Sequence, residues 1–167
     1  MIEDQKLTEH FTLFQLTHTD HAIYKEMNRQ IDDLQICKLQ EVARLLENAW
    51  TILETPLVVS SGYRCPALNQ AVGSTLRSQH LLCEAVDSVP KGLTVEEAFR
   101  KLRQAAKDRK ILFGQMIYEK ASRGYSGDIM EWIHLSLPAP YRPPERCGQI
   151  LAMNDGQYTL LETVQSD

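Results

Sequence analysis

Apolar residues recur at three- and four-residue spacing over a long segment in the first third of the chain. They are Ile36, Leu39, Val42, Ala43, Leu46, Ala49, Trp50 and Leu53. This period is typical of an amphipathic helix that buries one face. The helix should end at Thr55-Pro56, because the residue before a proline avoids the helical conformation. We interpret this helix as scaffold without a catalytic role.

Other segments predict a second helix and several strands. Thr94-Val95-Glu96-Glu97 has the pattern of a capping box, so a helix should follow through about Lys107. Runs that suit strands occupy 57–61, 84–89, 115–119 and 131–137.

The C-terminal part of the chain has a different pattern. Prolines interrupt regular structure between 138 and 144, and two apolar runs, 149–153 and 158–162, follow. Asn154-Asp155-Gly156 separates these runs, and Asp-Gly in that position predicts a hairpin. We therefore divide the chain into a main domain, 1–144, and a C-terminal hairpin appendage, 145–167.

Composition excludes several classes of protein. A chain of 167 residues with 43% hydrophobic and 24% charged residues suits one soluble domain with a proper core. The net charge of −4 argues against a nucleic acid as the main partner. No apolar run approaches the ~20 residues that span a bilayer, so we expect no membrane partner, and we expect a monomer.

The N-terminus and the cysteines bear on location. Met1 to Lys6 is polar, with neither a basic nor an apolar signal region, so we expect no signal peptide and synthesis in the cytoplasm. Cys37, Cys65, Cys83 and Cys147 show no C-x-x-C spacing, and reduced thiols are then the default.

Two short segments carry the candidate chemistry. Ser78 to Asp87 places His80 and Asp87 seven positions apart, and Glu131-Trp132-Ile133-His134 adds a second imidazole. Two histidines and one aspartate leave a fourth coordination position open, as catalytic zinc sites do. Our working hypothesis is a zinc hydrolase with ligands His80, Asp87 and His134, and Glu131 has the chemistry of a general base.

Strand geometry limits this hypothesis. Positions three apart point to opposite faces of a regular strand, so Glu131 must lie at or before the strand start, or at a bulge, to share a metal with His134. Trp132 shares a face with His134 and would form a wall of the site. Simpler explanations exist for each ligand: His134 as a polar residue on an exposed sheet face, His80 as a loop histidine bonded to a carbonyl, and Asp87 as a turn former.

Each of these residues alone is a weak signal, but together the motifs form a specific pattern. The chain shows Ser60-Ser61-Gly62-Tyr63-Arg64, then S-x-H-x-x-C-x-A-x-D, then E-x-x-H. In order and spacing it resembles the zinc D-Ala-D-Ala carboxypeptidase family over about residues 7–140. That family includes D,D-dipeptidases and the L-alanyl-D-glutamate peptidases of bacteriophage endolysins. The matching residues are Ser78, His80, Ala85, Asp87, Glu131 and His134.

The resemblance implies a fold, an activity and residue roles. The fold would be α+β of the hedgehog/DD-peptidase type, with helices packed on a small antiparallel sheet. The activity would be hydrolysis of a peptidoglycan stem peptide, at D-Ala-D-Ala or at L-Ala-D-Glu. Zn²⁺ would be held by His80, Asp87 and His134, with Glu131 as base and Arg64 over the scissile carbonyl. The remaining site residues would hold the ligands or the substrate: Ser78, Gln79, Tyr63 and Trp132.

The resemblance also implies how the protein would reach the cell wall, and it leaves alternative functions open. The opening Thr8 to Leu13 is similar to single-domain phage and prophage members, whose enzymes reach the wall by phage lysis or with the virion. A cytoplasmic D,D-dipeptidase fits the missing signal equally. The alternative to an enzyme is a zinc-stabilised binding module, or a phage structural module, with the same fold and no turnover.

Cys83 departs from the family pattern, which has glycine there. Glycine provides a positive φ or a close backbone approach, and cysteine supplies neither easily. A His-x-x-Cys chelate between His80 and Cys83, and a disulfide between Cys65 and Cys83, are the two alternatives that this residue leaves open.

Overall fold

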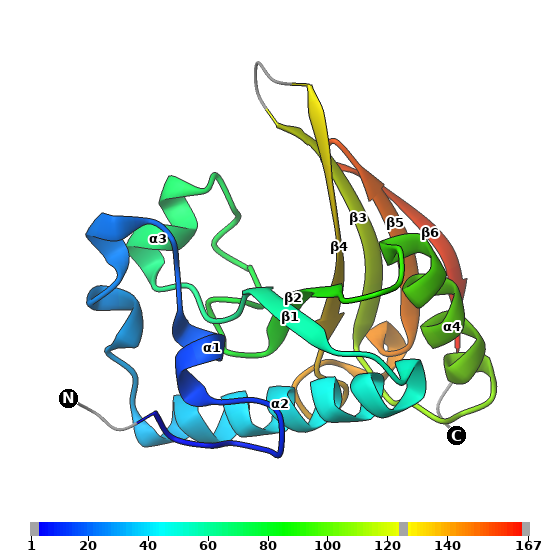
Figure 1. Ribbon diagram of the computed structural model, residues 1–167, viewed down its shortest axis with the longest axis horizontal. Helices are drawn as coiled ribbons and strands as arrows, with labels where there is room; N and C mark the ends of the chain where they lie inside the picture. The colour runs from blue at the N-terminus through cyan, green and yellow to red at the C-terminus, as the bar shows by residue number, and fades with distance from the viewer. Residues whose placement is uncertain (1–3, 124–126, 165–167) are drawn as a thin grey trace.

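The computed structural model describes residues 4–123 and 127–164 (Figure 1). Its helices are α1 (Leu13–Thr17), α2 (Asp33–Leu53), α3 (Pro66–Ala71) and α4 (Val95–Lys107). Short 3-10 turns lie at Ala22–Tyr24, Met27–Arg29 and Pro144–Arg146. Within the described ranges, no helix is both long and apolar enough to cross a membrane. Residues 165–167 of the predicted C-terminal appendage lie outside the described residues.

In the described residues, six strands form one open sheet. They are β1 (Leu57–Ser61), β2 (Ala85–Pro90), β3 (Gln115–Arg123), β4 (Asp128–Ser136), β5 (Gln149–Asn154) and β6 (Gln157–Thr163). Their order across the sheet is β1-β2-β4-β3-β5-β6. Neighbouring strands are antiparallel except β3 and β5, which are parallel. The predicted α+β class is confirmed.

Local signals in the sequence set the helix starts. The Asp32 carboxylate accepts a hydrogen bond from the Gln35 N–H at 2.8 Å, and the Gln35 side chain accepts one from the Asp32 N–H at 2.9 Å. The capping box predicted before α4 is also present, with Thr94 and Glu97 bonded reciprocally at 2.8 and 3.1 Å. These bonds satisfy amide groups that have no partner within the helix.

The two faces of the sheet have different surroundings. One face supplies Val86, Met116, Ile133, Leu135 and Ile150 to the hydrophobic core that includes α2 and α4. Because side chains alternate along a strand, the residues between them point to the other face. Asp87 of β2 and His134 of β4 lie on that second face, as the sequence predicted for His134 and Trp132.

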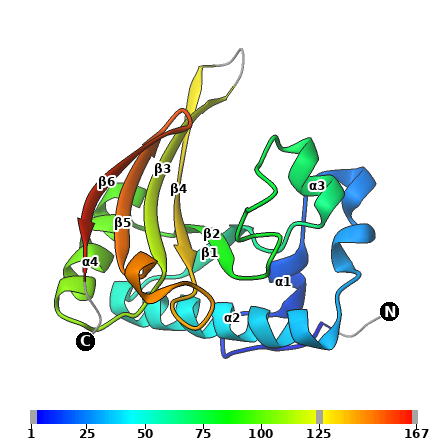
Figure 2. The same cartoon turned by 180° about the vertical axis from the view of Figure 1, so that it is seen from behind.

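The C-terminal hairpin continues the main sheet. Its turn residues Asp155 and Gly156 have φ of 46° and 83°, as the predicted Asp-Gly turn requires. Strand β5 pairs with β3 from Gln115↔Gln149 to Lys120↔Asn154, and β6 forms the edge (Figure 2). Fully buried Ile150 joins the common core. The described part of segment 145–167 thus shares one sheet and one core with the rest of the chain.

Candidate metal centre

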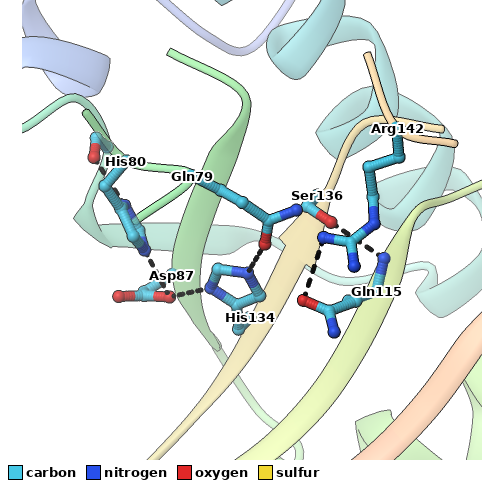
Figure 3. A network of polar contacts seen from close by, with 8 residues as sticks. Gln79, His80, Asp87, Gln115, His134, Ser136 and Arg142 are labelled. Carbon is cyan, nitrogen blue, oxygen red and sulfur yellow. Dashed lines mark hydrogen bonds and ion pairs between the residues drawn. The ribbon is translucent and has the colours of Figure 1, made fainter. Parts of the chain in front are cut away.

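The three predicted ligands lie together on the second face of the sheet. Asp87 is directly opposite His134 in the pairing of β2 with β4, and His80 comes from the loop before β2. Asp87 Oδ1 lies 2.9 Å from His134 Nδ1 and 3.3 Å from His80 Nε2 (Figure 3). All three residues are buried, and their ligand atoms lie within 4.8 Å of one another. This group can hold a metal ion.

The second nitrogen of each histidine is also engaged. His80 Nδ1 lies 2.7 Å from the Gly62 carbonyl oxygen, and His134 Nε2 lies 3.1 Å from Gln79 Oε1. An oxygen partner on the outer nitrogen is the usual way in which proteins orient a metal-binding imidazole. Two buried imidazoles and a buried carboxylate with such outer contacts fit a metal such as zinc. The sequence alone allowed His80 to be a loop histidine that simply bonds a backbone carbonyl. Its contact with the Gly62 carbonyl is instead part of this arrangement.

The loop behind His80 is anchored to α1. A Cβ atom at Gly62 would lie 2.2 Å from the Leu16 carbonyl oxygen, so glycine is needed at this position. The Tyr63 N–H donates to the same carbonyl at 2.7 Å, and the Arg64 N–H donates to the His80 carbonyl at 3.2 Å. These bonds hold the chain whose Gly62 carbonyl orients His80. They explain the Gly62-Tyr63-Arg64 part of the motif.

Cys83 takes up the conformation that glycine usually supplies. Its φ is +58° and its side chain is fully buried. Burial raises the pKa of the Cys83 thiol to about 12, which disfavours the thiolate that binds metals. Among the described residues, the atoms that converge with His80 belong to Asp87 and His134, and Cys83 is not in this group. Cys65 and Cys83 are both free, so they form no disulfide, and the ligand group that includes His80 does not include Cys83.

The electrostatic surroundings keep Asp87 ionised. Burial by itself would raise the pKa of Asp87, but the His80 and His134 imidazoles outweigh it and hold this pKa well below its usual range. A carboxylate that stays charged in a buried position requires a strong positive partner. Asp87 thus has the properties of a metal ligand.

Arg64 lies near the same group. Burial lowers the pKa of the Arg64 guanidinium, while the charges of Asp87 and Glu119 raise it, so both carboxylates lie within electrostatic range. Within the described structure, the Arg64 Nε atom is buried without a hydrogen-bond partner. A buried N–H group of this kind is suited to bind an oxygen of a substrate.

The other four predicted site residues fall into two pairs. Trp132 lies on the face of His134 and directly opposite Glu119, whose pKa its indole N–H lowers. The Gln79 Nε2 atom is a buried donor that has no partner in the part of the chain the structure describes. Ser78 contributes backbone bonds to the turn before His80. Tyr63 is buried, and burial raises the pKa of its phenol, while a hydrogen bond with Gln35 at the start of α2 opposes this. The structure thus brings Gln79 and Trp132 to the site and directs Tyr63 elsewhere.

Glu131 does not join the ligand group. Strand β4 begins at Asp128, and it pairs with β3 without a bulge from Arg123↔Asp128 to Met116↔Leu135. Glu131 therefore lies inside a regular strand, on the face opposite His134, and not at the strand start that its role as base required. Its carboxylate accepts a hydrogen bond from Tyr118 Oη at 2.9 Å and forms an ion pair with Lys120 Nζ at 2.8 Å. These contacts also lower its pKa.

Glu119 is a site residue that the sequence reasoning missed. It lies opposite Trp132 in the pairing of β3 with β4, on the same face as His134. Burial raises the pKa of Glu119 to about 7, and Asp87 adds to this, while His134, Arg64 and a hydrogen bond from Trp132 oppose it. The alternation of the predicted strand at 115–119 places Glu119 on the face of Ile117, but only the pairing with β4 shows that this is the face of His134.

Fold and site together define an α+β domain with a candidate metal centre on an open sheet. A family model described as peptidase M15 matches residues 9–122, about two thirds of the chain. The chain belongs to the peptidase M15 family, which confirms the resemblance to D-Ala-D-Ala carboxypeptidases. The matched residues include Arg64, His80 and Asp87 and end before His134. A search of curated proteins finds no match. Membership of a peptidase family implies a peptide substrate.

Proposed function

We propose that this protein is a zinc peptidase that hydrolyses the stem peptide of bacterial peptidoglycan, at D-Ala-D-Ala or at L-Ala-D-Glu. The observation that carries the proposal is the buried group of His80, Asp87 and His134 in a member of a peptidase family. Each histidine has its outer nitrogen on an oxygen, so one nitrogen of each ring is left for the metal.

The chain's own residues suit peptide hydrolysis. Zinc held by His80, Asp87 and His134 would polarise the scissile carbonyl and make water a better nucleophile at neutral pH. Arg64 would stabilise the negative charge that develops on the carbonyl oxygen. The free Nε2 donor of Gln79 would bind a further oxygen of the peptide. The monomeric state and delivery by phage lysis or with the virion stay predictions.

A second candidate function rests on the position of Glu131. Tyr118 and Lys120 hold this carboxylate on the opposite face of β4, away from the ligand group. If Glu131 were the one residue able to act as base, the domain would bind zinc and peptide without turnover. A binding module or phage structural module of the same fold is therefore the alternative.

One experiment separates the two functions. We expect the purified protein to hold about one zinc per chain, measured by elemental analysis, and Asp87→Ala to lose it. The zinc-loaded protein is then incubated with peptidoglycan and with a peptide that ends in D-Ala-D-Ala, and mass spectrometry identifies the products. Loss of one D-Ala indicates a carboxypeptidase, and a cut after L-Ala indicates an endopeptidase. Bound zinc with no product from either substrate would favour the binding module.

A further inference from the structure

The register of three strands brings one more carboxylate to the ligand group. Asp87 faces His134 across β2 and β4, and His134 faces Ile117 across β4 and β3. Glu119 is two residues from Ile117, so it lies diagonally across from His134 on the same face. Diagonal neighbours in an antiparallel pair are about 7–8 Å apart, within reach of a long side chain.

The surroundings of Glu119 are unusual for a glutamate. Only 8% of the residue is exposed. Glutamate is seldom buried to this extent unless it is paired. The charged groups that affect it are Arg64, Asp87 and His134, which all belong to the candidate centre. Glu119 is thus a buried carboxyl group on the sheet face of the candidate centre.

Glu131, in contrast, is already engaged. Its carboxylate is bound by Tyr118 and Lys120 on the face that packs toward the helices. To reach the ligand group it would have to give up both contacts and pass through the sheet. The two glutamates of neighbouring strands therefore have different environments, which suit different roles.

We propose that Glu119 is the proton acceptor of this site. The inference rests on the proposed function. As the water oxygen forms a bond to the scissile carbonyl carbon, the Glu119 carboxylate takes up a proton of that water. When the carbon–nitrogen bond breaks, Glu119 returns the proton to the leaving amine nitrogen, so that acid and amine products balance the substrate and one water. A buried carboxyl group on the face of the ligand group is suited to both transfers.

The test compares Glu119→Gln with Glu131→Gln, which changes the matched carboxylate on the opposite face. In zinc-loaded Glu119→Gln we expect kcat/KM on the cleaved peptide to fall by about 100-fold or more, as for loss of a general base. Zinc content should stay that of the wild type, since Glu119 is not a ligand. In Glu131→Gln we expect kcat/KM to change by less than about threefold, because its pair with Lys120 lies near the surface.

A second readout does not depend on turnover. Acetohydroxamate passes its hydroxyl proton to a nearby base when it binds a metal centre, so its affinity reports on that base. Measured by the visible absorption of the cobalt-loaded proteins, this affinity should weaken about tenfold or more in Glu119→Gln, as for loss of a hydrogen bond to a charged group. It should be unchanged in Glu131→Gln.

The outcomes are distinct. If Glu131→Gln shows the losses and Glu119→Gln does not, the assignment to Glu119 is wrong. Loss of zinc from Glu119→Gln would also overturn it, because the residue would then position the ligands. If the wild type cleaves no peptide, the proposed function fails, and the acetohydroxamate affinities alone decide on Glu119. A weaker affinity in Glu119→Gln than in the wild type supports the assignment, and an equal affinity overturns it. A wild type that binds neither zinc nor cobalt overturns both.

Discussion

Cys83 shows how a single residue can keep a backbone conformation that suits glycine. Its φ of +58° lies in the left-handed region, where a side chain other than glycine costs about 1–2 kcal/mol. The same residue fills a position in the core with no exposed surface. Backbone strain and side-chain packing therefore oppose each other at this point of the His80 loop.

We expect Cys83→Gly to be more stable than Cys83→Ala by about 1 kcal/mol, the reverse of the usual order of alanine over glycine. Both substitutions remove the buried thiol, but only glycine relieves the positive φ. Urea unfolding of the two variants measures the difference in the free energy of unfolding. An alanine variant as stable as the glycine variant, or more stable, would show that the backbone here is not strained.

At the scale of the elements, the β5–β6 hairpin bears most on how the chain is divided into domains. Its parallel pairing with β3 extends the sheet beyond the strands that carry the ligands. Tyr158 of β6 pairs with Met153 of β5, which pairs with Glu119 of β3, so Tyr158 and Glu119 lie on the same face of the sheet. The hairpin thus packs into the core through one face and places Tyr158 on the face of the candidate centre.

Ile150→Ala should destabilise the whole domain by about 2–5 kcal/mol, the usual cost of removing a fully buried isoleucine side chain. Leu160→Ala is the matched control from the same hairpin. Its side chain is 55% exposed, so the change should be within about 0.5 kcal/mol. Thermal or urea unfolding with one transition checks both. Equal, small effects in the two variants would favour the division into a main domain and an independent appendage.

At the scale of the whole molecule, the candidate centre connects parts that are distant along the chain. His80 lies in a loop whose backbone bonds reach α1 through Gly62 and Tyr63, whereas Asp87 and His134 lie in the middle of the sheet. Figure 1 shows these parts on the two sides of the molecule, with α1 and α3 on one side and β3 to β6 on the other. A metal held by all three residues would link the two sides.

Removal of the metal should therefore lower the melting temperature. A ligand at 100 times its Kd stabilises the folded state by about 2.7 kcal/mol, which corresponds to about 5–10 °C for a domain of this size. Differential scanning fluorimetry with zinc, and after dialysis against a chelator, measures the shift. Asp87→Ala is the control, since it should melt at the same temperature in both conditions. No shift in the wild type would contradict a metal link between the two sides.

Local patterns predicted most of the secondary structure and nominated the candidate metal-binding group. The apolar period of α2, the capping boxes and the Asp-Gly turn act within a few residues, so each could be predicted without knowledge of the rest of the chain. The ligand types and their order also suffice to nominate His80, Asp87 and His134. Sequence reasoning further placed Trp132 and His134 on one face of a strand, as the structure confirms.

Only the tertiary structure decided which glutamate lies at the site. The same alternation rule warned that Glu131 and His134 point apart in a regular strand, but the start of β4 at Asp128 and its lack of a bulge follow from pairing with β3. That pairing also brings Glu119 beside Trp132, although the two residues have no sequence relation. Strand register is set by contacts between distant segments, and a one-residue change would reverse every face. For this reason the candidate ligands could be nominated from the sequence, and the residue proposed to move the proton could not.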